Sequence, residues 1–129
     1  MLSVLLSLEE GGGAQLPLAE LAALDLATYL DRTPVDCEVL IFDQFEEVLT
    51  SDPGDREAKH AFFHALGAAL RPGNRWAVVA MREDHVASLA PYVRPLPNRL
   101  RTTFRLDLLG VDAALAAVQL PARERGVDF

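Results

Sequence analysis

The amino-acid sequence predicts an α/β fold, with a parallel sheet between layers of helices. Three short apolar runs, at about residues 37–43, 75–81 and 102–107, are typical of β-strands. The first two runs are continuously apolar, as expected of strands buried on both faces of a parallel sheet. Helical patterns separate and follow the runs, and this strand–helix alternation favours crossover connections between parallel strands.

The first 34 residues are expected to be helical. Residues 1–9 resemble the end of a helix, which the glycine run Gly11-Gly12-Gly13 closes as a flexible link. Residues 18–30 carry apolar side chains three and four positions apart, the spacing of one amphipathic helix. Pro34 favours an end to that helix, because the residue before a proline is biased away from helical geometry.

An amphipathic helix is expected between the first two strands. Asp52 followed by Pro53, or else Asp55, can open it with an N-cap. The run of residues 71–73 (Arg-Pro-Gly) ends it. Its predicted buried stripe consists of Ala58, Phe62, Ala65, Leu66 and Ala69.

The C-terminal third alternates loops and short helices. Residues 84–89 favour a short helix, and the three prolines within residues 91–98 favour a loop. After the third strand, Asp112 is expected to cap a helix that continues through Val118. Pro121 fits the first turn of a further short helix that runs to Gly126.

Composition restricts the class of protein. The 129 residues include 12 basic and 19 acidic side chains, for a net charge of −7, which argues against nucleic-acid binding. The apolar start, residues 1–8, lacks the basic flank of a secretory signal. No apolar run approaches the roughly 18 residues of a membrane span. We therefore expect a soluble, cytoplasmic protein of one domain, without a nucleic-acid or membrane partner.

Some reactive or aromatic side chains receive ordinary structural interpretations. Cys37 is the only cysteine and is expected to be a small buried residue. His60 and His64 are one helical turn apart, but neither the glutamate of H-E-x-x-H nor a third ligand accompanies them. Trp76 opens the second strand and is expected in the core.

Polar side chains follow the first two predicted strands. Asp43, Gln44, Glu46 and Glu47 come after the first, and Arg82, Glu83 and Asp84 come after the second. Ligands of open parallel sheets bind at the carboxyl ends of the strands. A carboxylate there can bind Mg²⁺, a second can orient water, and an arginine can contact phosphate. The alternative is that Asp43 only caps the turn that follows its strand.

Several segments resemble one known family. Residues 39–50, VLIFDQFEEVLT, resemble the Walker B segment of STAND-class P-loop NTPases, and are closest to the bacterial novel STAND group. Residues 75–84, RWAVVAMRED, resemble the sensor strand of that family. Residues 96–118 resemble its next strand and closing helix, and residues 121–129 resemble the start of its lid. The resemblance implies a P-loop NTPase-like three-layer fold and a signalling ATPase that uses ATP and Mg²⁺.

The resemblance also implies roles for individual residues. Asp43 would bind Mg²⁺ and so help to bind the nucleotide, and Glu46 or Glu47 would polarise the attacking water. Arg82 would contact the γ-phosphate. The implied organisation is a single partial NTPase domain over residues 1–129. It consists of a helical part (1–34), a Walker B and sensor core (35–120) and the start of the lid (121–129).

The phosphate-binding loop of the family has no counterpart in the sequence. That loop needs a lysine after a glycine and a serine or threonine after the lysine. Lys59, the only lysine, lies between Ala58 and His60 in a predicted helix, and Ala14 follows the glycine run. We therefore expect the middle part of a larger NTPase domain, from a truncated reading frame or a degenerate copy. Alone, it would bind nucleotide weakly or not at all.

Two functions remain open. The first is a fragment of a STAND-type ATPase switch, with the nucleotide as the partner of the parent protein. The second is a non-catalytic α/β interaction module, which associates with itself or with partner domains of a signalling protein. An unpaired sheet edge would carry that association, because removing the strand that bears the loop leaves two edges open, unless residues 102–106 pair directly with residues 76–81.

Overall fold

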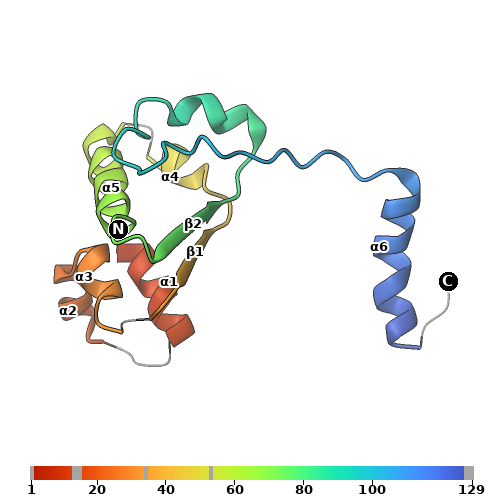
Figure 1. Cartoon of the computed structure of the whole chain (residues 1–129), viewed down its shortest axis with the longest axis horizontal. Helices are drawn as coiled ribbons and strands as arrows, with labels where there is room; N and C mark the ends of the chain where they lie inside the picture. Colours follow the sequence, from red (N-terminus) through yellow and green to blue (C-terminus); the bar gives the residue numbers. More distant parts are fainter. Residues whose placement is uncertain (1, 13–15, 34, 53, 127–129) are drawn as a thin grey trace.

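The computed structural model describes residues 2–12, 16–33, 35–52 and 54–126. The chain divides visibly into a globular part (residues 2–100) and an extended C-terminal arm (residues 101–126) (Figure 1). In chain order, the elements are α1 (Leu2–Gly12), α2 (Leu18–Ala23), α3 (Leu26–Leu30), β1 (Glu38–Phe42), α4 (Glu47–Thr50), α5 (Arg56–Ala69), β2 (Arg75–Val79), the 3-10 helix η1 (Glu83–Leu89) and α6 (Val111–Glu124).

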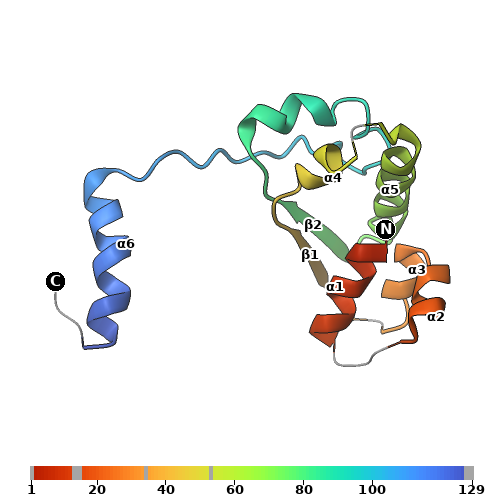
Figure 2. The ribbon, with the colours of Figure 1, turned by 180° about the vertical axis from the view of Figure 1, so that it is seen from behind.

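The sheet contains two strands in the described part of the chain. β1 and β2 pair in parallel, with Glu38 opposite Arg75 and Phe42 opposite Val79. The prediction of two parallel strands joined through a helix is confirmed, and α5 provides the crossover (Figure 2). The fold is therefore a mixed helix and strand structure with a small parallel sheet flanked by helices.

The prediction that both faces of the sheet are buried is wrong. Every second strand residue turns the same way, and those on one face are exposed by half or more: Val39 51%, Ile41 75%, Trp76 62% and Val78 52%. Trp76 is therefore not a core residue, and Cys37, just before β1, is exposed as well. An apolar strand is buried only where another element covers it, and in the described residues helices cover one face alone.

The predicted third strand at residues 102–107 does not form. Residues 101–110 have no regular secondary structure, and Phe104 and Leu106 are 87% and 86% exposed. A strand is stable only when a neighbouring strand forms hydrogen bonds with its backbone, and this segment lies outside the sheet. Because the sheet has two strands and not three, the expected three-layer P-loop architecture is not reproduced in the described residues.

The helices differ from the predictions at their ends. Residues 18–30 form two helices, because the Asp25 carboxylate accepts the Thr28 N–H at 2.8 Å and starts α3. In the arm, α6 is one helix that contains Pro121 and begins after Gly110, so neither a second helix nor an Asp112 cap exists. The prediction that Gly11 and Gly12 form a flexible link after the first helix is wrong, because α1 continues through Gly12. Gly13, the helix end at Pro34, the alternative helix start at Pro53 and lid residues 127–129 lie outside the described residues.

The core is centred on aromatic side chains between α5 and the sheet. The rings of Phe45 and Phe63 are 5.8 Å apart, and Tyr92 stacks on Phe63 at 5.4 Å. From the N-terminal helices, Leu5, Leu21 and Leu26 are almost fully buried. These contacts join α1, α3, α5 and the loop after η1 into one hydrophobic core.

Helix α5 begins at an Asp55 N-cap, whose carboxylate accepts the Ala58 N–H at 2.8 Å. Phe62, Leu66 and Ala69 of the predicted stripe are buried, whereas Ala58 is exposed. Gly67 is buried against the loop after η1, where an added Cβ would lie 2.5 Å from the Pro95 carbonyl oxygen. Only a glycine allows this loop to approach so closely.

A buried arginine connects the amino ends of both strands to α3. The side chain of Arg75 is 4% exposed and pairs with Asp31 and Glu38, each at 2.8 Å. Burial alone would lower the pKa of Arg75, but its bonds to Asp31 and Glu38 outweigh burial and raise that pKa. This role of Arg75 was not predicted from the sequence.

Among the described residues, no helix is long and apolar enough to cross a bilayer.

Candidate functional site

The polar residues predicted from the sequence lie beyond the carboxyl ends of the two strands. Asp43 directly follows β1, and Arg82 lies three residues after β2. The register aligns Phe42 with Val79, so both strands end at the same level. Two backbone bonds continue the pairing past that point, from Ala80 N–H to the Phe42 oxygen at 2.8 Å and from Phe45 N–H to the Ala80 oxygen at 3.0 Å. Asp43 and Arg82 therefore lie at the carboxyl ends of two neighbouring parallel strands.

A tight turn directs Asp43 outward and the next aromatic residue inward. Gln44 has a φ of 50°, in the left-handed region, and its N–H donates to Asp43 Oδ1 at 2.8 Å. After this turn Phe45 enters the core, with 2% exposure, while Asp43 stays exposed. Asp43 therefore does stabilise the turn, as the alternative interpretation expected. Within the described residues its Oδ2 atom accepts no protein hydrogen bond.

Glu46 connects the two strand ends. It is the N-cap residue of α4 and half-buried, and its carboxylate accepts the backbone N–H of Arg82 at 3.4 Å. Glu47, the first residue of α4, is exposed. The structure thus brings Glu46, and not Glu47, to the end of β2.

The Arg82 guanidinium is held by Asp84. Nε and Nη2 of Arg82 donate to the two carboxylate oxygens of Asp84 at 3.1 and 2.8 Å, in a bidentate pair. The hydrogen bonds raise the pKa of Arg82 and lower that of Asp84, and the opposite charges add to both shifts. The sequence placed Asp84 at this strand end but did not predict its pair with Arg82, although the Arg-x-Asp spacing after a strand could have indicated it.

A comparison with known protein families identifies the family of the chain. The model of the family described as Novel STAND NTPase 1 matches residues 7–129, which include both strands, all of the strand-end residues and the arm. The chain belongs to the novel STAND NTPase 1 family. No curated protein and no solved structure matches the chain. Membership of a STAND NTPase family confirms the resemblance drawn from the sequence and an NTPase-related region.

The carboxylates of this STAND NTPase chain can provide a single magnesium ligand. Among the residues that the structure describes, no three histidine, cysteine, aspartate or glutamate side chains form a metal-binding group. Mg²⁺ commonly keeps several waters and takes one or two carboxylates together with phosphate oxygens. Asp43, exposed and with one uncommitted oxygen, fits a single ligand of that kind.

The lysine of the STAND NTPase chain is committed elsewhere. Nζ of Lys59 donates to the backbone oxygen of Asp52 at 2.6 Å, and Lys59 is only 7% exposed. Lys59 therefore cannot act as the phosphate-binding lysine of a P-loop. This agrees with the prediction from its place inside a helix.

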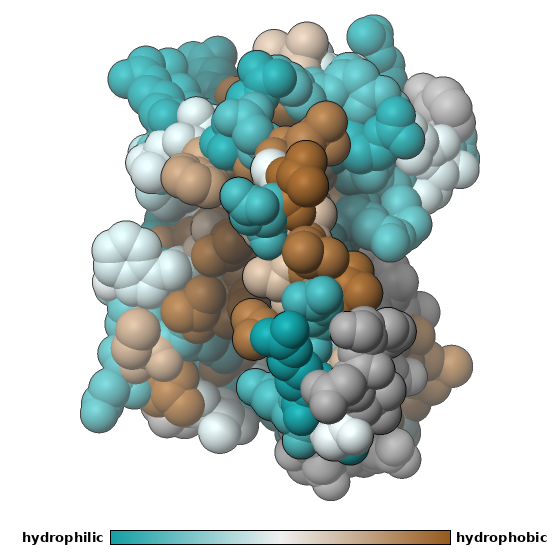
Figure 3. Space-filling model, turned by 90° about the vertical axis from the view of Figure 1, so that its right-hand side faces the viewer, coloured by the Kyte–Doolittle hydropathy of each residue, from teal (hydrophilic) through white to brown (hydrophobic). Residues whose placement is uncertain are grey.

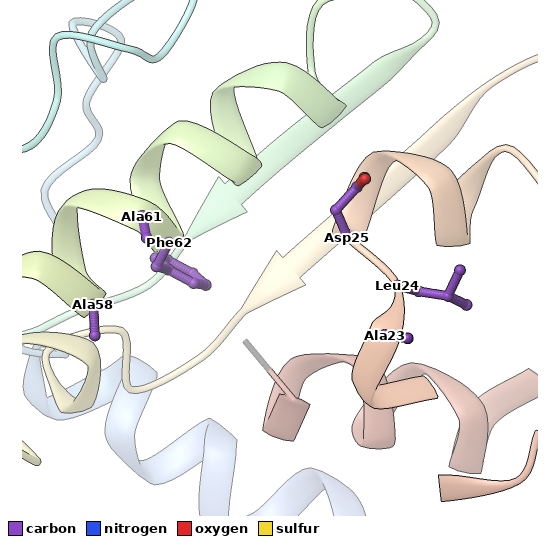
Figure 4. A pocket seen from close by; sticks show the side chains of 6 residues that line it. All are labelled: Ala23, Leu24, Asp25, Ala58, Ala61 and Phe62. Carbon is purple, nitrogen blue, oxygen red and sulfur yellow. The ribbon is translucent and has the colours of Figure 1, made fainter. Parts of the chain in front are cut away.

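A pocket in the STAND NTPase chain is lined in part by Phe62, whose ring lies 6.4 Å from that of Phe42 at the end of β1 (Figure 4). The α2–α3 junction faces α5 across it, and the lining residues are Ala23, Leu24, Asp25, Ala58, Ala61 and Phe62. Both carboxylate oxygens of Asp25 accept hydrogen bonds from Thr28, which leaves mainly small apolar groups. The pocket thus adds no catalytic group to those at the strand ends.

Proposed function

We propose that this chain contains the Walker B and sensor segments of a STAND-type signalling ATPase, which switches between states as it binds and hydrolyses nucleotide. One observation carries the proposal: Asp43 and Arg82 lie at the carboxyl ends of adjacent parallel strands, where α/β folds bind their ligands. Family membership supports it. Residues 35–120 would be the core of this region, and residues 121–129 the start of its lid.

Each strand-end residue has a proposed role. Asp43 would bind Mg²⁺ through the oxygen that the turn leaves uncommitted, and the metal ion would neutralise charge on the phosphates of ATP. Glu46 would orient the attacking water, since its carboxylate lies at the end of β2, whereas Glu47 would be the weaker candidate. Arg82 would exchange its bond with Asp84 for one with the γ-phosphate.

The chain alone would bind ATP weakly or not at all. A Walker B acid binds metal, but the β- and γ-phosphates also need a cradle of backbone amides and a lysine, and Lys59 is committed to Asp52. Calorimetric titration of the chain with MgATP should show no binding with a Kd below about 1 mM, which corresponds to about −4 kcal/mol. A tighter Kd would contradict this part of the proposal.

The roles can be tested in a parent protein that carries the phosphate-binding loop. We expect Asp43→Asn and Glu46→Gln to lower kcat at least a hundredfold, a common effect of losing such groups. Glu47→Gln should have a smaller effect. Glu20→Gln is the matched control, since it neutralises an exposed acid of α2. Unchanged turnover in Asp43→Asn would remove Asp43 from the mechanism.

A second function, a non-catalytic interaction module, is favoured by the open edges of the sheet. In the described residues β1 and β2 pair only with each other, which leaves one unpaired edge on each strand. Unpaired edges recruit other strands. Sedimentation of the nucleotide-free chain tests this function, and a monomer at every concentration would rule out self-association.

A further inference from the structure

The charged residues of the molecule are unevenly distributed along the chain. Viewed from the side on which the arm lies, hydrophilic residues border a hydrophobic band (Figure 3). Although the chain has a net charge of −7, the stretch between Asp84 and Asp107 contains four arginines and no acidic residue. A local excess of positive charge attracts anions. This stretch is therefore a candidate region for binding an anion.

The acidic residues that flank this stretch are already paired. Asp84 binds Arg82 at 2.8 Å, and Asp107 pairs with Arg105 at 3.3 Å. Glu83 also pairs with Arg105, at 3.2 Å. Three arginines of the stretch are exposed and have no carboxylate partner within the described residues: Arg94, Arg99 and Arg101. Their charges are therefore left for a ligand from outside the chain.

Two of these arginines line the same pocket, which we call the arginine pocket. It has a volume of about 420 Å³, and its lining consists of Pro97, Asn98, Arg99 and Arg101. The pocket lies where the globular part meets the arm, and none of the strand-end residues lines it. Oδ1 of Asn98 accepts the Leu100 N–H at 2.9 Å. The side-chain groups of the lining that remain uncommitted in the described residues are therefore all hydrogen-bond donors.

A left-handed turn places the two arginines at the arginine pocket. Arg99 and Leu100 have φ values of 54° and 52°, which residues other than glycine adopt rarely. Leu100 packs against the core, whereas Arg99 and Arg101 on either side of it are exposed. Leu96, with 3% exposure, anchors the preceding loop in the same core. An anchored loop lowers the entropy that is lost when both arginines bind one ligand.

We propose that the arginine pocket binds the phosphate group of a small ligand. A guanidinium group binds a carboxylate or a phosphate through two parallel hydrogen bonds. The two oxygens of a carboxylate accept one such pair, whereas a phosphate monoester has three acceptor oxygens for two guanidinium groups and the Asn98 amide. The inference goes beyond the proposed ATPase and requires none of its residues.

The pocket is larger than a free phosphate ion requires. Its volume of about 420 Å³ lies within the roughly 300–1,000 Å³ of small-molecule sites. Pro97 adds an apolar surface beside the donors, against which the organic part of a phosphate monoester can pack. A monoester should therefore bind more tightly than inorganic phosphate.

Titration of the full chain with glycerol phosphate, followed by amide NMR at constant ionic strength, tests the proposal. We expect saturable shifts at residues 98–101, with a Kd on the order of 10 mM because the arginines are exposed. Inorganic phosphate should bind more weakly, and acetate at least threefold more weakly than glycerol phosphate. Equal affinity for the two phosphates would restrict the recognised group to phosphate itself. No saturation, or the same response to acetate, overturns the proposal.

Arginine variants locate the binding site. Arg99→Gln and Arg101→Gln should each weaken glycerol phosphate binding at least threefold, and the double variant should abolish saturation. Arg125→Gln is the matched control, since it removes an exposed arginine just after α6 and should leave the Kd unchanged. Binding that survives both pocket substitutions but is lost in Arg82→Gln would place the anion at the strand ends. That outcome would overturn the arginine pocket and leave the proposed ATPase function standing.

Discussion

The globular part and the arm both contain regularly spaced apolar residues, but these residues have different fates. In the globular part Phe63 and Leu26 have no exposed surface, and the spacing of α5 matches its burial. In the arm Leu108 is 99% exposed, and α6 buries nothing despite an equally regular stripe. Spacing thus determines which side of a helix is apolar, whereas burial requires a second surface within reach.

The largest expected difference in stability between the two parts comes from removing an aromatic ring from the globular part. Phe63 contacts Phe45, Phe62 and Tyr92. Phe63→Ala should lower the free energy of unfolding by about 3–5 kcal/mol, because a cavity is left in the core. In the arm, Leu120→Ala should change it by less than about 0.5 kcal/mol. Urea unfolding followed by circular dichroism measures both, and equal losses would show that the arm belongs to the same cooperative unit.

The second difference between the globular part and the arm is the effect of replacing a glycine by alanine on stability. Helix propensity alone predicts that Gly67→Ala in α5 stabilises the protein by about 1 kcal/mol. We expect a net loss of about 1–2 kcal/mol instead, because the new Cβ would lie 2.5 Å from the Pro95 oxygen and 2.9 Å from its carbon, and backbone must move.

Gly110→Ala is the matched control in the arm, where nothing lies within 4 Å of an added Cβ and φ is −63°. Its effect on the unfolding midpoint should be close to zero. A stabilised Gly67→Ala variant would show that the loop after η1 is not packed on α5.

The smallest difference in stability comes from changing the N-cap residues of helices, and this difference depends on pH. Asp25→Ala should cost about 1 kcal/mol at pH 7, and Asp25→Asn less, because asparagine also caps. The Thr28 N–H, followed by the Thr28 hydroxyl, lowers the pKa of Asp25 from 3.8. A lowered pKa contributes stability above the unfolded value, and that contribution is lost as the pH falls through the folded value.

The advantage of the wild type over Asp25→Asn should therefore shrink as the pH falls below about 3.8 and disappear once the pH is below the lowered pKa of the folded state. An advantage that persists in acid would contradict the role of the charge. In the arm, α6 has no side-chain cap at Gly110, and Gly110→Asp should add only a few tenths of a kcal/mol. Its effect should appear as helical circular dichroism and not in the unfolding midpoint.

The sequence was sufficient for features that depend on near neighbours. The apolar run before Asp43 and the run from Trp76 predicted both strands, and their order predicted the parallel pairing. The positions of Asp43, Glu46 and Arg82 followed from that order. The Arg82–Asp84 pair did not, because the choice of partner depends on side-chain geometry.

Features that depend on a distant partner could not be predicted. Phe104 and Leu106 have the composition of a strand, but a strand needs a neighbour to bond its backbone. Continuous apolarity in β1 predicted burial on both faces, yet coverage depends on which helices surround the sheet. The sequence does contain a local signal for the break before α3, because Asp25 lies three residues before Thr28 and can cap a new helix there. The apolar spacing over residues 18–30 predicted one continuous helix instead.

The left-handed backbone of Gln44 has a consequence for sequence variation. That single residue, whose side chain belongs neither to the core nor to the proposed reaction, sets the direction of both Asp43 and Phe45. Glycine, asparagine and aspartate tolerate such backbone angles, whereas β-branched residues do not. Homologues that preserve this reversal should therefore avoid valine, isoleucine and threonine at position 44, even where they lack every group needed for hydrolysis.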